Sequence, residues 1–139
     1  MTKTVFLDTN IFLRLFVKEG GKQYSDCSQL FTLIETSKIK GLICSVVLLE
    51  IYFTLNSFYK FSPRQCQKYL TKIISDRNIK IIDDFDYNKA LDLFIQTKVK
   101  FTDCLIASLG FFETNKQIIS YDKDFDRLKF DRLEPSEII

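Results

Sequence analysis

Short apolar runs alternate with stretches of helical periodicity along this chain of 139 residues, and this alternation restricts the folds open to it. A run of only a few apolar residues is too short for a helix and predicts a buried strand. We expect strands at Val5–Leu7, Leu42–Cys44, Ile79–Ile82 and Gln117–Tyr121, and a short fifth around Leu133. Because helices separate these strands, the sequence predicts an α/β fold with a mainly parallel sheet of four to five strands, formed by residues 1–139 as one domain.

The segments between the strands carry signals for helix starts and ends. Asn10 is expected to cap a first helix that continues through Phe16 and stops at Gly20 and Gly21. Ser62 followed by Pro63 predicts the start of another helix, since a side-chain cap precedes Pro at the first helical position. The other helices are expected from about Lys22 to Ile39, where Gly41 ends the pattern, from Ser45 through Phe53, through Ala90–Ile95, and from Thr102 to about Thr114.

The chain contains no histidine. This absence excludes Ser–His and Cys–His nucleophilic triads, zinc hydrolysis through histidine ligands and nuclease mechanisms that use two histidines. Any hydrolytic chemistry must therefore use carboxylates, most naturally together with metal ions. The net charge of only +2 does not by itself indicate a nucleic-acid-binding protein.

The four cysteines form no CxxC pair, and their spacing matches neither a zinc site nor a redox motif. The N-terminal segment enters a predicted strand directly, without the long apolar stretch of a signal peptide. No apolar run approaches the length of a membrane span. We therefore expect a cytoplasmic protein with reduced cysteines and no membrane partner.

Two acidic residues stand out in the first half of the chain. Asp8 directly follows the first predicted strand, where it could either cap the next helix or take part in a site. Glu50 interrupts an apolar helix and has no Lys or Arg within three or four residues along that helix. Burying an unpaired carboxylate costs roughly several kcal/mol, so Glu50 needs a partner. We favour a bound cation over a distant basic side chain.

Three more acids occur in the second half. Asp103 lies in the first turn of an otherwise apolar helix, where the helix dipole alone could explain it. Asp122 and Asp124 follow the fourth predicted strand and could instead form a turn or cap a short helix. In a parallel sheet, however, all these positions can meet at one edge. Carboxylates gathered there repel each other unless cations neutralise them, and such oxygen ligands select Mg²⁺ or Mn²⁺.

Four segments together resemble the acidic motifs of PIN domains. They are Leu7-Asp8-Thr9-Asn10, Glu50 in its apolar helix, Phe101-Thr102-Asp103-Cys104-Leu105-Ile106-Ala107 and Ser120-Tyr121-Asp122-Lys123-Asp124-Phe125. The order and spacing of the motifs match those of PIN domains, and the resemblance covers nearly the whole chain. Among PIN proteins, this compact chain is most similar to VapC-type toxins. The resemblance implies a three-layer α/β/α sandwich. Ser120 and Tyr121 stand where Thr and a smaller apolar residue are common.

The resemblance also implies a role for each residue. Asp8, Glu50 and Asp103 would bind one or two Mg²⁺ or Mn²⁺ ions and be catalytic, and Asp122 would complete the site, with Asp124 as its rival. Asn10 and Ser120 would orient the carboxylates. The implied activity is metal-dependent endonucleolytic hydrolysis of RNA. The implied partners are a small antitoxin protein and a second copy of the chain in a homodimer.

An acidic site repels RNA, so basic residues are needed at its rim. Candidates for RNA binding are Arg14, Lys18, Arg64, Lys68 and Lys100, each of which could also be an ordinary surface charge. Two alternatives keep the same fold: a non-catalytic module that binds RNA or protein, and a housekeeping nuclease without an antitoxin. A receiver-type signalling domain and a haloacid-dehalogenase-like phosphatase fit poorly, because a strand-borne Lys and a DxD motif, respectively, are missing.

Overall fold

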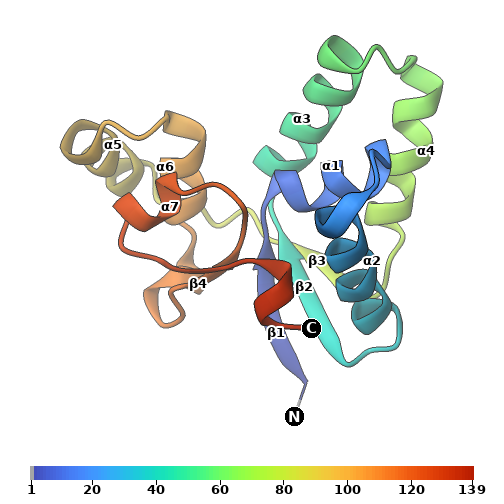
Figure 1. Cartoon of the computed structure of the whole chain (residues 1–139). Coiled ribbons are helices and arrows are strands. Elements are labelled where there is room, and N and C mark those ends of the chain that lie inside the picture. The colour runs from blue at the N-terminus through green and yellow to red at the C-terminus, as the bar shows by residue number, and fades with distance from the viewer. Residues whose placement is uncertain (1) are drawn as a thin grey trace.

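The computed structural model describes residues 2–139, and it is built on a central sheet of five strands (Figure 1). The strands are β1 (Lys3–Leu7), β2 (Ile39–Ile43), β3 (Ile79–Ile81), β4 (Gln117–Ile119) and β5 (Asp131–Leu133). Their order is β3-β2-β1-β4-β5, and every neighbouring pair is parallel. The predicted α/β class is therefore confirmed, with an entirely parallel sheet and with the fifth strand in place.

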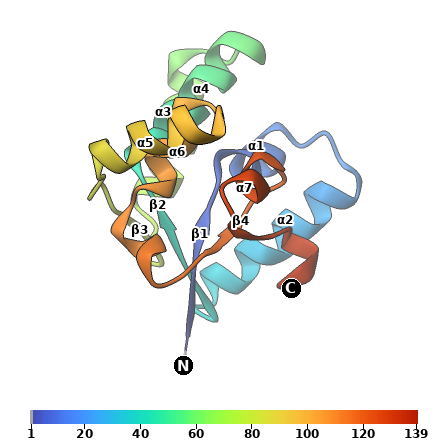
Figure 2. The same cartoon turned by 90° about the vertical axis from the view of Figure 1, so that its left-hand side faces the viewer.

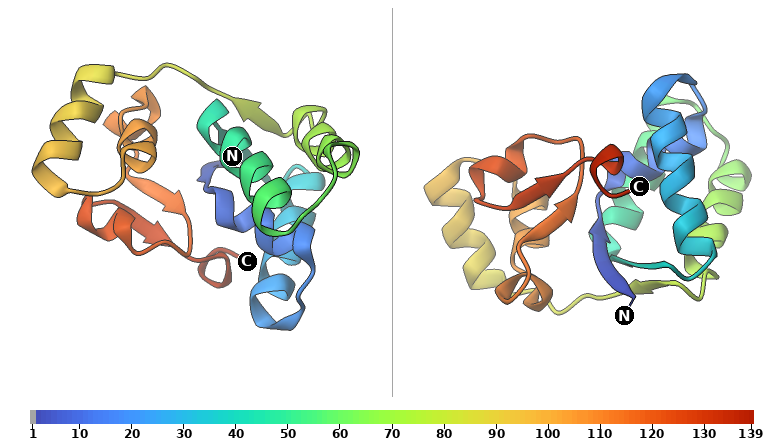
Figure 3. Two further views of the ribbon diagram at one scale, coloured as in Figure 1. Left: turned by 90° about the horizontal axis from the view of Figure 1, so that it is seen from above. Right: turned by 60° about the horizontal axis from the view of Figure 1, so that its bottom comes forward.

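Helices lie on both sides of the sheet. They are α1 (Thr9–Val17), α2 (Gly21–Glu35), α3 (Ser45–Phe53), α4 (Pro63–Ile74), α5 (Tyr87–Thr97), α6 (Phe101–Ala107) and α7 (Asp124–Arg127), and a π-helical turn at Thr54–Phe58 extends α3. Helices α1, α2 and α4 lie on one side and α5, α6 and α7 on the other (Figures 1 and 3). The short 3-10 helix Pro135–Glu137 at the C-terminus contacts α2 (Figure 3).

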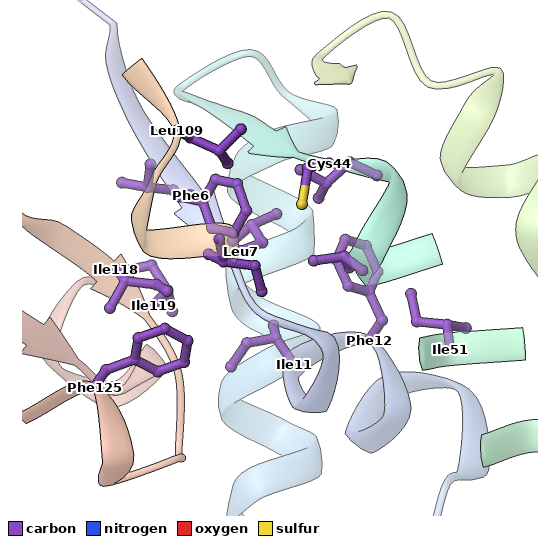
Figure 4. Packing of buried hydrophobic residues seen from close by; sticks show 14 of the residues in the cluster. Phe6, Leu7, Ile11, Phe12, Cys44, Ile51, Leu109, Ile118, Ile119 and Phe125 are labelled. Atoms are coloured by element: carbon purple, nitrogen blue, oxygen red, sulfur yellow. The ribbon is translucent and has the colours of Figure 1, made fainter. Parts of the chain in front are cut away.

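Strand β1 is the centre of the core. Its side chains Phe6 and Leu7 are fully buried on opposite faces, as expected for a parallel strand covered on both sides (Figure 4). Phe supplies much of the bulk: the Phe6 ring packs edge-on against Phe112 at 5.2 Å, and Phe112 meets Phe130 at 4.6 Å. This packing fixes β1, and so fixes the position of the residue that follows it, Asp8.

Gly41 does not break the chain between a helix and a strand, as the sequence suggested, but lies inside β2. A Cβ at this position would come within 2.8 Å of Leu7 Cδ1, so Gly is needed for the close packing of β1 side chains against β2. The preceding helix accordingly ends at Glu35 rather than Ile39. The N–H groups of Thr36 and Ser37 bond back to its last carbonyls, and Ser37 turns with a positive φ of 62°.

Other helix boundaries also differ from the predicted ones. The first helix begins at Thr9, so Asn10 is its second residue and not its cap. The helix predicted from Thr102 to Thr114 ends at Ala107, and a separate 3-10 turn occupies Gly110–Glu113. The chain becomes extended at Leu109, whose ψ of 141° cannot continue a helix. The start at Ser62 and Pro63 is confirmed, with a capping box closed by Gln65.

Among residues 2–139, no helix is both long enough and apolar enough to cross a membrane. The four cysteines are all buried, and none of them forms a disulfide within this part of the chain.

Candidate metal centre

The acidic residues of the four motifs meet at the carboxyl edge of the sheet. Asp8 follows β1, Asp122 follows β4, Glu50 lies in α3 after β2, and Asp103 lies in the first turn of α6. Helices α3 and α6 lie side by side and contact each other, which brings Glu50 on α3 close to Asp103 on α6 (Figure 2). A pocket of about 180 Å³ opens here, lined by Asp8, Thr9, Asn10, Leu13, Glu50, Thr54, Lys100 and Asp122.

Asp8 occupies the N-cap position of α1, but its side chain makes no capping hydrogen bond and is held instead by other polar side chains. The Ser120 hydroxyl donates to Asp8 Oδ2 at 2.6 Å, and Asn10 Nδ2 donates to the same oxygen at 3.2 Å. Asn10 Oδ1 in turn accepts from the backbone N–H of Tyr121. Both residues that were expected to orient the carboxylates thus contact Asp8, and only 4% of Asp8 is exposed.

Ser120 also joins Asp8 to the fourth motif, because its hydroxyl oxygen accepts from the backbone N–H of Asp122 at 2.9 Å. Asp122 Oδ1 accepts from the N–H of Asp124, which closes the turn before α7. Carboxylate oxygens of Asp103, Asp122 and Asp124 lie within 4.8 Å of one another. Both rivals for the fourth position therefore approach Asp103, but it is Asp122 that lines the pocket.

Glu50 is oriented by Thr9, a residue that the sequence had not singled out. The Thr9 hydroxyl donates to Glu50 Oε1 at 2.9 Å across 41 positions of sequence. Helix α3 itself is anchored at its first turn, where Asp83 accepts bonds from the Ser45 N–H and hydroxyl. The position of Thr9 between Asp8 and Asn10 was the available signal, since the motif places all three side chains at the edge of the sheet.

Asp103 is the most constrained of the acids. It is 1% exposed, and its Oδ2 has no hydrogen-bond partner within residues 2–139. Native proteins rarely leave a buried polar atom unpaired. An interaction with the dipole of α6 does not remedy this, because it supplies no donor to that oxygen. The unpaired Oδ2 of Asp103 therefore indicates that a ligand binds here. Because other carboxylates lie close to this atom, the ligand is expected to be a cation.

Lys100 is the nearest positive charge. Its Nζ lies 3.8 Å from Asp103 Oδ2 and 3.9 Å from both Glu50 Oε2 and Asp122 Oδ2. The sequence suggested Lys100 only as a contact for RNA at the rim, whereas the structure places it against the carboxylates themselves. Burial lowers the pKa of Lys100, but the surrounding carboxylates more than offset this effect, so its pKa is raised overall.

The crowding of acids perturbs two of them strongly. Burial raises the pKa of Asp103 from 3.8 to about 8; Lys100 opposes the shift, and the carboxylates of Asp8, Asp122 and Glu50 add to it. Burial likewise raises the pKa of Asp8 to about 6, against the bond from Ser120. These carboxyl groups are destabilised as anions, which is the electrostatic condition that a divalent cation relieves.

The other basic candidates lie farther from the carboxylates. Arg14 lines a second hollow, and Leu13 belongs to the walls of both this hollow and the carboxylate pocket. The Arg14 side chain also pairs with Glu19. Lys18 lines a separate groove between α1, α2 and α4. Arg64 and Lys68 are on α4, where the Lys68 ammonium lies over the Tyr69 ring. Their part in RNA binding stays a prediction.

Two solved structures have a similar fold. One is VapC20 of Mycobacterium tuberculosis, a toxin that cleaves the sarcin–ricin loop; it is 14% identical, covers 91% of this chain and 95% of its own, and has a TM-score of 0.70. The other is VapBC2 of Rickettsia felis bound to a DNA fragment from its promoter, 21% identical over 94% of this chain and 98% of that one, with a TM-score of 0.66. At these identities the likeness shows the fold alone.

The comparison by sequence is more specific about the family. No curated protein gives a significant match to this chain. The PIN domain family, however, matches residues 5–131, a span that includes all four acidic motifs. This match spans most of the chain and agrees with its α/β fold and parallel sheet, and it shows that the chain belongs to the PIN domain family.

Proposed function

We propose that this protein is a metal-dependent endoribonuclease and the toxin of a VapBC-like toxin–antitoxin pair. The observation that carries the proposal is a pocket lined by Asp8, Glu50 and Asp122. Beside it lies the buried Asp103, which is close to Asp122 and whose Oδ2 has no hydrogen-bond partner within residues 2–139. Membership of the PIN domain family and the fold shared with VapC toxins favour the same function.

The donor set fits a hard divalent cation. Asp8, Glu50, Asp103 and Asp122 would hold one or two Mg²⁺ or Mn²⁺ ions through carboxylate oxygens, with Asp124 as a fifth candidate. Such an ion supplies Lewis-acid activation of water and neutralisation of the phosphate. The side chains fit this role because each of Glu50 and Asp122 has one oxygen fixed by a protein donor and the other free.

The remaining residues of the pocket orient these ligands. Thr9 fixes Glu50, while Ser120 and Asn10 fix Asp8, so the oxygens keep their positions as charge changes in the pocket. Because the chain has no histidine, the proton of the attacking water passes to a carboxylate or to solvent. Lys100 lies against the carboxylates and Arg14 lines a neighbouring hollow, so we expect these two basic residues to contact an RNA phosphate.

Exposed apolar side chains support the proposal of protein partners. Leu49 and Phe53 on α3, and Phe58 on the turn that extends it, are 56%, 59% and 74% exposed. A second group lies on α5, where Leu91 and Ile95 are one helical turn apart and exposed. Large exposed apolar groups mark interaction surfaces, and we propose that a cognate antitoxin and a second copy of the chain cover them.

The function is tested by incubating the purified, partner-free protein with end-labelled structured RNAs in Mn²⁺ or Mg²⁺ and in EDTA. We expect internal cleavage with the metal, none with EDTA, and none by a Glu50→Gln variant. Glu113→Gln, which neutralises an exposed Glu outside the pocket, should cleave like the unmodified protein. If the folded protein cleaves none of several RNAs, the chain is a non-catalytic PIN module that binds RNA or protein.

Ser120→Ala should weaken metal binding while keeping every carboxylate. The Ser120 hydroxyl connects Asp8 to the Asp122 backbone, and losing such a supporting bond typically costs about tenfold to a hundredfold in affinity or activity. The measurement is Mn²⁺ titration calorimetry combined with RNA cleavage rates. Ser108→Ala is the matched control, because Ser108 is also a buried hydrogen-bonded serine but lies outside the pocket. An equal loss of affinity in both variants would exclude a special role for Ser120.

A further inference from the structure

Lys100 differs from every other lysine in residues 2–139. It is the only one whose ammonium lies within 4 Å of more than one carboxylate, and it has three such partners: Glu50, Asp103 and Asp122. Its position follows from the chain path, because Lys98 turns with a positive φ of 58° at the end of α5 and Lys100 then occupies the N-cap position of α6. A single positive charge is thereby placed among the acids.

The three oxygens that face Lys100 are those left free by the hydrogen bonds of the pocket. Thr9 bonds the other oxygen of Glu50, and the Asp124 N–H bonds the other oxygen of Asp122. Asp103 Oδ2 has no hydrogen-bond donor within residues 2–139. These free oxygens are also the ones that remain available to bind a divalent ion.

The contacts of Lys100 are attractive but loose. Distances of 3.8–3.9 Å exceed those of a hydrogen bond, so the ammonium offsets negative charge without satisfying the buried oxygen of Asp103. The Lys100 side chain is 54% exposed and sits on a flexible stem, so it can leave for solvent at small cost. A divalent ion bound to the same oxygens would repel an ammonium only about 4 Å from them.

We propose that Lys100 is the resident cation of the metal-free pocket and that a divalent ion binds by exchange with it. Lys100 thus holds the carboxylates together before the metal arrives and lowers the affinity with which the metal binds. This inference rests on the proposed function only in taking the pocket to be a divalent-metal site. It assigns Lys100 a role in metal loading that is distinct from contact with RNA at the rim.

The test is calorimetric titration of Mn²⁺ into the protein without RNA. Lys100→Met should bind Mn²⁺ on the order of tenfold more tightly, because the competing charge is gone. Lys100→Arg keeps the charge and should remain closer to the unmodified protein than Lys100→Met. Lys123→Met is the matched control: it removes an exposed lysine next to Asp122 in sequence that makes no ion pair within residues 2–139, and its affinity should change less than about twofold.

Thermal unfolding gives a second readout that also reports folding. In EDTA, Lys100→Met should unfold at a lower temperature than the unmodified protein, and Mn²⁺ should raise its melting temperature by more. Equal Mn²⁺ affinities of the unmodified protein and Lys100→Met, or weaker binding by the variant, overturn the exchange while leaving the proposed nuclease intact. If neither folded protein binds Mn²⁺, both the exchange and the metal-dependent function are overturned.

Discussion

Replacing Asp103 by Asn should abolish metal-dependent RNA cleavage without weakening the fold. Asn keeps the shape of the side chain but removes the charge from the most buried acid of the pocket. Loss of a charged group that acts as part of a catalytic unit lowers turnover on the order of a thousandfold or more. The measurement is the cleavage rate of an end-labelled RNA in Mn²⁺, together with the melting temperature of each protein in EDTA.

The stability result separates loss of function from misfolding. Burial of the Asp103 carboxyl is unfavourable in the metal-free state, so Asp103→Asn should melt at or above the temperature of the unmodified protein at pH 8. Asp92→Asn neutralises an exposed acid on α5 and should leave both readouts unchanged. Cleavage by Asp103→Asn at the normal rate would show that the chemistry does not use this pocket.

The metal-free protein should lose stability as the pH rises from about 5 to about 8. Asp103 and Asp8 have raised pKa values in the fold, about 8 and about 6, against an ordinary value of 3.8. In this window the folded state holds protons that the unfolded chain has released, so rising pH favours unfolding. We expect the free energy of unfolding to decrease by up to roughly 5 kcal/mol over this range, measured by urea denaturation in EDTA.

Two further measurements test whether this change of the free energy of unfolding with pH arises in the pocket. Asp103→Asn should remove most of the pH dependence of the free energy of unfolding, because the group with the larger pKa shift no longer titrates. Saturating Mn²⁺ should also remove it, because a metal stabilises the folded state most where the carboxylates are ionised. A stability that increases with pH over this range, or an unchanged slope in Asp103→Asn, would contradict the assignment.

Much of the fold follows from local patterns in the sequence. Short apolar runs predicted the strands β1 and β3 and the position of β5, and Ser62 with Pro63 predicted the start of α4. The errors arose where tertiary packing decides. The sequence suggests that Gly41 ends a helix, but its missing side chain makes room for the Leu7 side chain of the neighbouring strand. Nothing local to Gly41 reveals that contact.

The candidate site was also predictable only in part from local sequence patterns. Asp8, Glu50, Asp103 and Asp122 could be identified because each acid stands beside an apolar strand or within an apolar helix. Thr9 and Lys100 were missed as partners of these acids because the contacts join distant positions. Thr9 contacts Glu50 across 41 positions of sequence, and Lys100 contacts Glu50 across 50. Such pairs depend on how α1, α3 and α6 meet, which neither composition nor periodicity encodes.

Whether these carboxylates form one divalent-metal site can be seen in an anomalous difference map at the manganese edge, recorded from crystals grown with Mn²⁺. We expect a peak in the pocket next to carboxylate oxygens of Asp103 and its neighbours Asp8, Glu50 and Asp122, and we expect the Lys100 ammonium to have moved away. A fully ordered pocket that shows no peak while Lys100 stays against the three carboxylates would contradict this expectation.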